Sequence, residues 1–310
     1  MADVLTHAYD LVKEYLSTER PKPFATGLKN LDKALNGGLF PGTLNILGGR
    51  PGEGKTTLAL QIGMEMAKQG GRVLFISLEM SQQELIERLL CARLERSQTE
   101  LRFMQDEGVL EKASTNFLDE LKKSFLHIVD DQGADLNGIK ALLKAKEEAG
   151  EPPPQLLVVD HLQMVWLPET QQRTDAIATY LRELKDLAKE RDMAVIVCSQ
   201  INRSVYSQKG NGNGGYVPAA HNLKSSGAIE ELADLVLLGY RKNLDQDLDE
   251  VGAMKDIEYE IKIAKHRRGP MTHLTMLFRP PCFTFLEPMG TWEPKTADGA
   301  AGGEDSGGEL

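Results

Sequence analysis

The residues best suited to chemistry in this chain form one glycine-rich segment that also holds a lysine and a hydroxyl group. The segment reads Gly49-Arg50-Pro51-Gly52-Glu53-Gly54-Lys55-Thr56 and is followed by Thr57. It joins an apolar run to a helical pattern, which is the setting of a phosphate-binding loop. In such a loop the backbone N–H groups surround a β-phosphate, the lysine reaches the β- and γ-phosphates, and the hydroxyl holds magnesium. The segment predicts a site for a nucleoside triphosphate with Mg²⁺; the alternative is a chance match in a glycine-rich turn.

Three polar side chains come directly after apolar runs that predict buried strands. In open α/β sheets, ligands bind at this end of the strands. Asp160 is placed to hold the magnesium ion, Glu79 to deprotonate an attacking water, and Gln200 to sense a γ-phosphate. The ordinary alternatives are a turn or helix cap for Asp160, a helix-start glutamate for Glu79 and a solvated loop side chain for Gln200.

Two cations, Lys265 and Arg267, flank His266 near the turn at Gly269-Pro270. On such a turn they are solvated charges, unless the turn reaches the nucleotide of another subunit. There they would neutralise charge that develops on the γ-phosphate. The residues alone favour neither alternative.

A long polar loop lies between Gln200 and Ala228. Loops of this length inside a compact domain are usually functional or disordered. This loop holds a glycine and asparagine run with scattered cations and hydroxyl groups, which suit close contact with a phosphate backbone. The candidate DNA contacts are Arg203, Lys209, Lys224, Ser225, Ser226 and Gly227. The alternative is a plain flexible surface loop.

Alternating strand and helix patterns must position these residues. They predict an α/β fold with a mostly parallel sheet and helices on both faces. Strands are expected at residues 44–48, 73–78, 125–129, 156–160, 194–199 and 235–239, and helices at 56–69, 81–96, 137–149, 175–191 and 226–232. Period-two patterns at residues 257–264, 273–278 and 283–286 predict an antiparallel extension at one edge of the sheet.

Composition limits the class of protein. Of the 310 residues, 41% are hydrophobic and 26% charged, which is ordinary for a globular protein. No apolar run approaches the roughly 18 residues of a membrane helix, and the chain start lacks a signal-peptide pattern. Cys91, Cys198 and Cys282 stand far apart in apolar segments, which indicates buried thiols and a reducing cytoplasm. The net charge of −10 argues against a general nucleic-acid coat but leaves room for a local basic channel.

The chain divides into three expected parts. Residues 1–20 have apolar positions at helical spacing, so this helix must cover either its own domain or a neighbouring subunit. Residues 21–290 form the main domain. Residues 291–310 are rich in glycine and acidic residues and are expected to be disordered.

Taken together, the motifs resemble those of the DnaB family of replicative DNA helicases, in its RecA-like ATPase domain. The resemblance covers residues 20 to 288 approximately. Its most specific parts are Ser77-Leu78-Glu79-Met80-Ser81 and the pair of cations in Lys265-His266-Arg267. The matching motifs are Thr26-Gly27, Leu31-Asp32, Gly37-Gly38-Leu39, Pro41-Gly42, the P-loop, Ser77-Leu78-Glu79-Met80-Ser81, Asp160-His161-Leu162-Gln163, Ser199-Gln200-Ile201-Asn202-Arg203, Ser226-Gly227-Ala228-Ile229-Glu230, Ala233-Asp234, Tyr240-Arg241 and Lys265-His266-Arg267.

The resemblance implies a RecA-like P-loop NTPase that forms a ring, usually a hexamer, with ATP between subunits and single-stranded DNA in the central channel. It leaves a primase or a helicase loader open as a partner, while the lack of a long apolar run indicates no membrane. By position, Glu79 matches the catalytic base, Asp160 the acid that holds magnesium through water, and Gln200 the γ-phosphate sensor. Lys265 and Arg267 would act on the neighbour's ATP, with Arg267 as the arginine finger. Residues 1–20 match the linker helix that docks on the adjacent subunit.

The chain departs from the family pattern at several points. The family's amino-terminal helical domain is absent, as expected for a trimmed chain or a short phage- or plasmid-type member. Lys224-Ser225-Ser226-Gly227 stands where Arg-Glu-Ser-Gly is usual, Pro51-Gly52-Glu53-Gly54 where Pro-Ser-Met-Gly is common, and His161 where tyrosine is common. The expected function is an ATP-dependent helicase motor that translocates on single-stranded DNA. The alternative is a RecA-like DNA-dependent or regulatory ATPase of the recombination-accessory type, which does not unwind duplex DNA.

Overall fold

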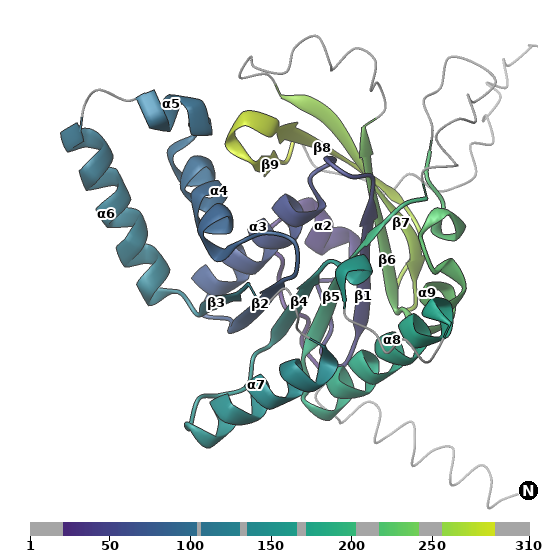
Figure 1. Ribbon diagram of the computed structural model, residues 1–310. Coiled ribbons are helices and arrows are strands. Elements are labelled where there is room, and N and C mark those ends of the chain that lie inside the picture. Colours follow the sequence, from purple (N-terminus) through teal and green to yellow (C-terminus); the bar gives the residue numbers. More distant parts are fainter. Residues whose placement is uncertain are drawn as a thin grey trace, which may run out of the picture.

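The computed structural model describes residues 21–103, 107–130, 135–165, 172–202, 217–241 and 256–288 (Figure 1). The helix predicted at residues 1–20 and the tail predicted at 291–310 lie outside the described residues. Among the residues described, no helix is long and apolar enough to cross a membrane.

The described strands form one sheet, in the order β3-β2-β4-β5-β1-β6-β7-β8-β9. Strands β1 to β6 run parallel, and β7, β8 and β9 continue the sheet antiparallel at one edge, as the sequence predicts. The strands are β1 (Leu44–Gly49), β2 (Val73–Ser77), β3 (Leu126–Val129), β4 (Leu156–Asp160), β5 (Ala194–Gln200), β6 (Leu235–Arg241), β7 (Ile257–His266), β8 (His273–Arg279) and β9 (Thr284–Leu286).

Helices cover both faces of the sheet (Figure 1). Alternate strand residues point to opposite faces, so Phe75 packs into a core with α2, α3 and α4, while Leu74 and Ile76 pack into a second core with α7, α8 and α9. The described helices are α2 (Lys29–Ala34), α3 (Lys55–Lys68), α4 (Gln82–Leu94), α5 (Gln98–Phe103), α6 (Glu107–Lys123), α7 (Leu136–Glu148), α8 (Arg173–Glu190) and α9 (Ser226–Leu232).

Helices α5 and α6 are absent from the helices expected from the sequence. None of the residues of α5 is buried, so no apolar stripe marks it. Phe117 of α6 reaches the core, but Phe103 of α5 and Leu118 of α6 are 77% and 46% exposed. Figure 1 shows α6 standing off from the body of the molecule beside α4. This helix pair therefore presents apolar side chains that no residue of the described ranges covers.

The sheet register brings the predicted site residues to the carboxyl ends of the parallel strands. Ser77 at the end of β2 lies beside Asp160 at the end of β4, and Gly49 at the end of β1 lies beside Gln200 at the end of β5. Because parallel strands all have their carboxyl ends on the same side of the sheet, the loops that follow them converge on one region. The α4 helix begins directly after the carboxyl end of β2, with Ser81 and Glu84 forming a capping box.

Candidate nucleotide-binding and catalytic site

The P-loop joins β1 to α3, and two of its glycines have left-handed backbone conformations. The φ angles of Gly52 and Gly54 are 75° and 87°, values that favour glycine over any residue with a side chain. A Cβ atom on Gly54 would also lie 2.9 Å from Cζ of Phe285. Lys55 is the first residue of α3, and its Nζ donates to the carbonyl oxygen of Arg50 at 2.8 Å. The lysine side chain therefore lies over the loop that would bind the phosphate.

Glu53 supports the loop from within the protein. It is 3% exposed, and its Oε2 accepts a hydrogen bond from the backbone N–H of Arg50 at 3.0 Å. Burial raises the pKa of Glu53, against the lowering effect of the Arg50 N–H. Gly49, Arg50 and Glu53, predicted to bind the nucleotide, do not line the cavity beside the loop among the residues described.

A cavity of about 480 Å³ opens beside the P-loop. The predicted groups Pro51, Gly52, Gly54, Lys55, Thr56, Thr57, Glu79, Asp160 and Gln200 all line it. His161 lines the same cavity, which continues to a second wall made by Arg88, Arg241, Phe278, Pro280 and Phe283. The strand-end groups and the phosphate-binding loop therefore face one common space.

Asp160 meets the chemical demands of a magnesium site. Its side chain is 1% exposed, and its Oδ2 has no hydrogen-bond partner in the described part of the chain. A buried carboxylate oxygen without a partner is costly, and a cation bound directly or through water would satisfy it. The Thr56 hydroxyl lines the same cavity and adds the oxygen ligand that Mg²⁺ prefers. Burial lowers the pKa of Lys55, while the negative charges of Asp160 and Glu79 oppose that shift.

Glu79 and Gln200 are joined through His161. The Glu79 Oε2 lies 3.0 Å from Nδ1 of His161, and the Gln200 Nε2 lies 2.9 Å from Nε2 of the same ring. Ser81 pairs with Glu84, so Glu79 is not the partner of the α4 cap. Gln200 is half-buried, and its backbone N–H donates to Oε1 of Gln163 at 3.1 Å. Burial lowers the pKa of His161, although the charges of Asp160 and Glu79 raise it in part.

The second wall of the cavity combines cations with aromatic rings. The Arg88 guanidinium carbon lies 4.9 Å from the ring centroid of Phe283, and that of Arg241 lies 5.5 Å from the centroid of Phe278. Arg241 also donates from Nη2 to the carbonyl oxygen of Gly52 at 3.3 Å. This wall can receive a flat, apolar ring beside a phosphate chain.

This combination of P-loop, strand-end acids and antiparallel extension has a counterpart among known proteins. The chain matches the family model described as the DnaB-like helicase C terminal domain over residues 24–287. The chain belongs to this family.

Two curated relatives illustrate the membership. The DnaB-like chain is 33% identical over 261 residues to the replicative DNA helicase DnaB of Pasteurella multocida (strain Pm70), which covers 82% of this chain and 53% of that protein. It is 30% identical over 285 residues to the replicative DNA helicase DnaC of Bacillus subtilis (strain 168), which covers 89% of this chain and 59% of that protein. The chain thus spans about half the length of the curated relatives it matches.

Two solved structures have the same fold as the DnaB-like chain. One, described as an ATPase domain, superposes with a TM-score of 0.74 and 25% identity, over 93% of this chain and 98% of that chain. The other, a DnaB-like replicative helicase described together with its interactions with primase, superposes with a TM-score of 0.76 and 24% identity, over 93% of this chain and 67% of that chain. The RecA-like α/β fold expected from the sequence is thereby confirmed.

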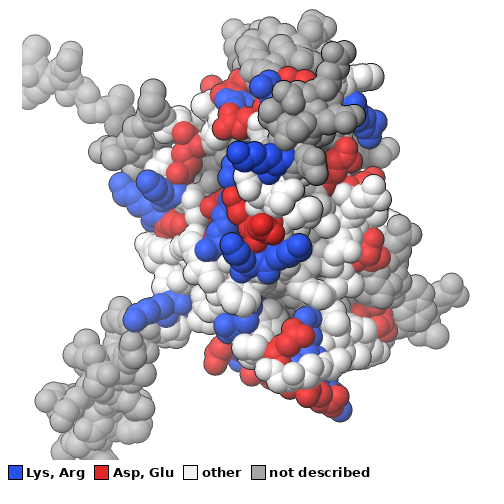
Figure 2. Space-filling view, turned by 90° about the vertical axis from the view of Figure 1, so that its left-hand side faces the viewer, with Lys and Arg blue, Asp and Glu red and all other residues white. Residues whose placement is uncertain are grey.

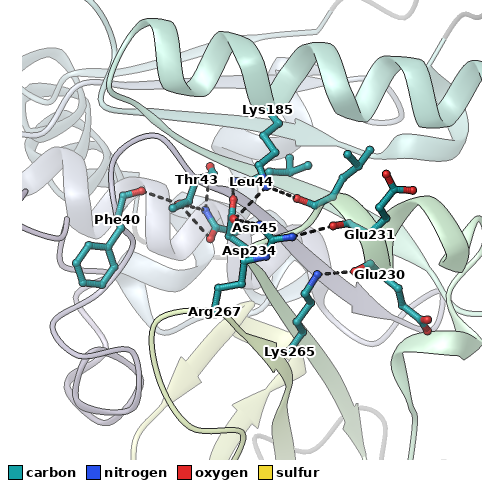
Figure 3. Close-up of polar contacts among 11 residues, drawn as sticks. Phe40, Thr43, Leu44, Asn45, Lys185, Glu230, Glu231, Asp234, Lys265 and Arg267 are labelled. Carbon is teal, nitrogen blue, oxygen red and sulfur yellow. Dashed lines mark hydrogen bonds and ion pairs between the residues drawn. The ribbon is translucent and has the colours of Figure 1, made fainter. Parts of the chain in front are cut away.

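In the DnaB-like chain, Lys265 and Arg267 lie away from the nucleotide cavity and bind the end of α9 (Figure 3). Lys265 Nζ donates to the Glu230 carbonyl, and Arg267 Nη2 donates to the Glu231 carbonyl at 2.9 Å. Arg267 Nη1 also lies 3.4 Å from Oδ1 of Asp234. Cations at a helix C-terminus are favourable because they complement the helix dipole. The side chain of Arg267 is 49% exposed, which leaves it accessible to a neighbouring molecule.

Asp234 is the centre of this cluster. Its Oδ1 also lies 3.1 Å from Nζ of Lys185, and its Oδ2 accepts from the backbone N–H of Leu44 at 3.0 Å. Lys185 Nζ donates in turn to the Leu232 carbonyl at 2.7 Å. Each of the last three carbonyls of α9 therefore accepts a hydrogen bond from a cation, and Asp234 links two of these cations, Lys185 and Arg267, to β1 (Figure 3).

The candidate DNA contacts lie partly outside the described residues, because Arg203 and Lys209 belong to the range that is not described. Ser226 and Gly227 begin α9, Ser225 is its N-cap residue, and Lys224 directly precedes that cap. Lys224 Nζ lies 3.4 Å from Oε1 of Gln200. A Cβ atom on Gly227 would meet nothing within 4 Å, so no described neighbour requires glycine there. The position is open to the close approach of another backbone.

The face that carries α5 and α6 does not show the charge pattern of a nucleic-acid surface. On the side of the molecule that carries α5 and α6, Lys and Arg side chains stand among Asp and Glu side chains (Figure 2). A phosphate-tracking face would instead concentrate one sign of charge. The start of α9 is therefore a better candidate for DNA contacts than this face.

Sequence reasoning did not single out every residue that lines the cavity. Arg241 belongs to a family motif, but nothing in its spacing indicated a contact with Gly52. Arg88 lies on the amphipathic helix α4, where an exposed cation is ordinary. Phe283 follows the Pro280-Pro281 pair with a φ angle of 50°, and this pair was the one signal that the chain turns there.

Proposed function

We propose that this chain is the ATPase motor of a ring-forming DNA helicase, which hydrolyses ATP and translocates on single-stranded DNA during replication. The observation that carries the proposal is that Gln200 contacts both the nucleotide cavity and the candidate DNA loop. Its amide reaches His161 and, through it, Glu79 in the nucleotide cavity, and it reaches Lys224 at the candidate DNA loop. Such a connection would let a nucleic acid bound at Lys224 influence the groups in the nucleotide cavity.

The cavity supports a division of roles among its own residues. Lys55 and the P-loop N–H groups would bind the β- and γ-phosphates, and Thr56 and Asp160 would hold the magnesium ion that neutralises phosphate charge. Glu79 would accept a proton from the attacking water. Gln200 would contact the γ-phosphate, and the wall around Phe283 and Arg241 would receive the base.

Two features of the described residues support ring assembly: exposed apolar side chains and a cavity that a neighbour's cation could complete. Phe103 and Leu118 expose apolar surface on α5 and α6, which suits a docking site for the amphipathic segment predicted at residues 1–20 of a neighbour. No cation outside the P-loop and the second wall faces the cavity among the described residues, so a further charge for the γ-phosphate would come from Arg267 of another subunit. The proposed ring is hexameric, with a primase or a loader as a further partner.

Steady-state ATP hydrolysis with and without a single-stranded oligonucleotide, at low and moderate salt, tests the proposal. We expect turnover to rise with DNA, and the rise to fade with salt because DNA contacts release counterions. Lys55→Ala should abolish turnover under all conditions, while Lys68→Ala, an exposed lysine at the end of α3, should leave it unchanged. Turnover that ignores DNA would instead favour the regulatory or recombination-accessory ATPase, and wild-type turnover in Lys55→Ala would remove the nucleotide site.

A further inference from the structure

His161 lies between the two groups whose states must be coordinated during hydrolysis. It is 4% exposed and directly follows Asp160 at the end of β4. One ring nitrogen contacts Glu79 at 3.0 Å and the other contacts Gln200 at 2.9 Å. Gln200 continues the series to Lys224 at 3.4 Å. Four side chains from separate segments therefore form one continuous hydrogen-bonded series.

The direction of every hydrogen bond in this series is fixed by its two ends. The Lys224 ammonium can only donate, so the amide of Gln200 presents Oε1 to it and Nε2 to His161. An ionised Glu79 carboxylate can only accept, so Nδ1 of His161 carries the proton. Nε2 of His161 then accepts from the Gln200 amide. The donors all point from Lys224 toward Glu79, and only one tautomer of the ring satisfies both contacts.

The series gives Glu79 two distinguishable states. While His161 donates to it, the Glu79 carboxylate is held and one of its oxygens is occupied. A DNA phosphate competes with Gln200 for Lys224, because a charged acceptor is stronger than an amide oxygen. The amide of Gln200 is then free to turn toward the γ-phosphate, and His161 loses the partner that orients its ring. Glu79 is released to accept a proton from water.

We propose that His161 is a positioning residue that restrains Glu79 in the DNA-free state and makes its release depend on Gln200 and Lys224. This inference rests on the proposed function, because it assigns Glu79 to proton transfer and Lys224 to DNA.

Two substitutions separate the two ring contacts. In His161→Asn the side-chain amide nitrogen occupies the place of Nδ1, so the bond to Glu79 persists and the link to Gln200 is lost. In His161→Gln the amide reaches the place of Nε2, so the link to Gln200 persists and Glu79 is freed. Both changes introduce a neutral amide, so they serve as controls for each other.

The measurement is kcat and KM for ATP, with and without saturating single-stranded oligonucleotide. We expect His161→Gln to raise DNA-free kcat by about tenfold, the effect of losing one hydrogen bond to a charged group. We expect His161→Asn, which keeps the bond to Glu79 but has no Gln200 partner to orient it, to raise DNA-free kcat by less than His161→Gln does and to lose stimulation by DNA. KM should stay within about twofold in both variants, because His161 restrains the base rather than the nucleotide.

Three outcomes decide the matter. Stimulation at the wild-type ratio in both variants, or equal loss of kcat in both with and without DNA, would overturn the restraining role. If wild-type turnover ignores DNA, the proposed function fails instead, and the higher DNA-free kcat of His161→Gln over His161→Asn still tests the hold on Glu79. A wild-type chain without any turnover would overturn both proposals. Thermal unfolding of each variant confirms that the fold is intact.

Discussion

At the scale of single residues, the site contains polar groups that a phosphate or a cation would bind better than the described residues do. Asp160 has a buried oxygen without a partner in the described part of the chain, and Lys55 bonds a carbonyl of its own loop where a phosphate would bind better. Such groups are costly unless a ligand completes them. The cavity is thus already polarised for a phosphate chain and a cation.

Substitution of Asp160 by asparagine tests this assignment. The change keeps the size of the side chain but removes its charge, so the affinity for Mg²⁺ in the presence of nucleotide should fall by at least about tenfold. Titrating Mg²⁺ against the fluorescence of a labelled ADP measures it. Asp186→Asn, an exposed position on α8 with the same change of charge, is the control. Equal Mg²⁺ dependence in the two variants would contradict a magnesium role for Asp160.

At the scale of elements, the antiparallel extension supports the P-loop. The last described strand of the sheet, β9, has one side without a strand partner, and α3 covers it. The Gln61 amide donates to the Phe285 carbonyl at 2.8 Å and accepts from the Phe285 N–H at 2.8 Å. Phe285 stacks on Phe278 with ring centroids 4.4 Å apart and lies against Gly54. One glutamine therefore replaces a neighbouring strand and ties the extension to the helix that begins at Lys55.

Gln61→Leu should therefore destabilise the domain. It leaves the N–H and C=O of Phe285 without partners, which costs about 1–3 kcal/mol, and it should also weaken ATP binding because Phe285 supports Gly54. Urea unfolding and nucleotide titration measure the two effects. Gln69→Leu, at the exposed end of α3, should stay within about 0.5 kcal/mol of wild type. An equal effect of both substitutions would show that the Gln61 contact carries no stability.

The sequence predicted the elements whose residues are buried on both sides. Strands such as β4 are continuous apolar runs with a polar residue at the end, so their position and the residue at their edge could be read together. Helix α5 could not be found in this way, because none of its residues is buried. In α6 the adjacent residues Phe117 and Leu118 have different surroundings, because Phe117 is buried and Leu118 is exposed.

The same limit applies to the site. Convergence of parallel strands predicts that Glu79, Asp160 and Gln200 approach the P-loop. It does not predict that His161 contacts two of them, because those contacts depend on rotamers and on the register of β2, β4 and β5. The second wall, with Arg88 and Phe283, comes from elements that meet only through tertiary packing.

At the scale of the whole molecule, the expected ring would divide one active site between two subunits. Inactive Arg267→Ala subunits mixed with wild-type subunits should then reduce turnover more steeply than their proportion, because each such subunit disables the site of its neighbour. ATP hydrolysis measured across mixing ratios tests this. Arg268→Ala is the control, since Arg268 packs over the ring of Phe40 with its guanidinium carbon 4.6 Å from the centroid. Loss in strict proportion to the mixing ratio would argue against a shared site.

The engagement of Lys265 and Arg267 with α9 has a consequence for how firmly such a ring closes. Both cations are hydrogen-bonded within the single chain. To reach a neighbour's phosphate, they must break their bonds to the carbonyls of Glu230 and Glu231. The net gain is a difference between two sets of hydrogen bonds rather than the full value of a new one. An interface that closes by such an exchange can open again at little cost, and each opening returns the cations to a place already prepared for them.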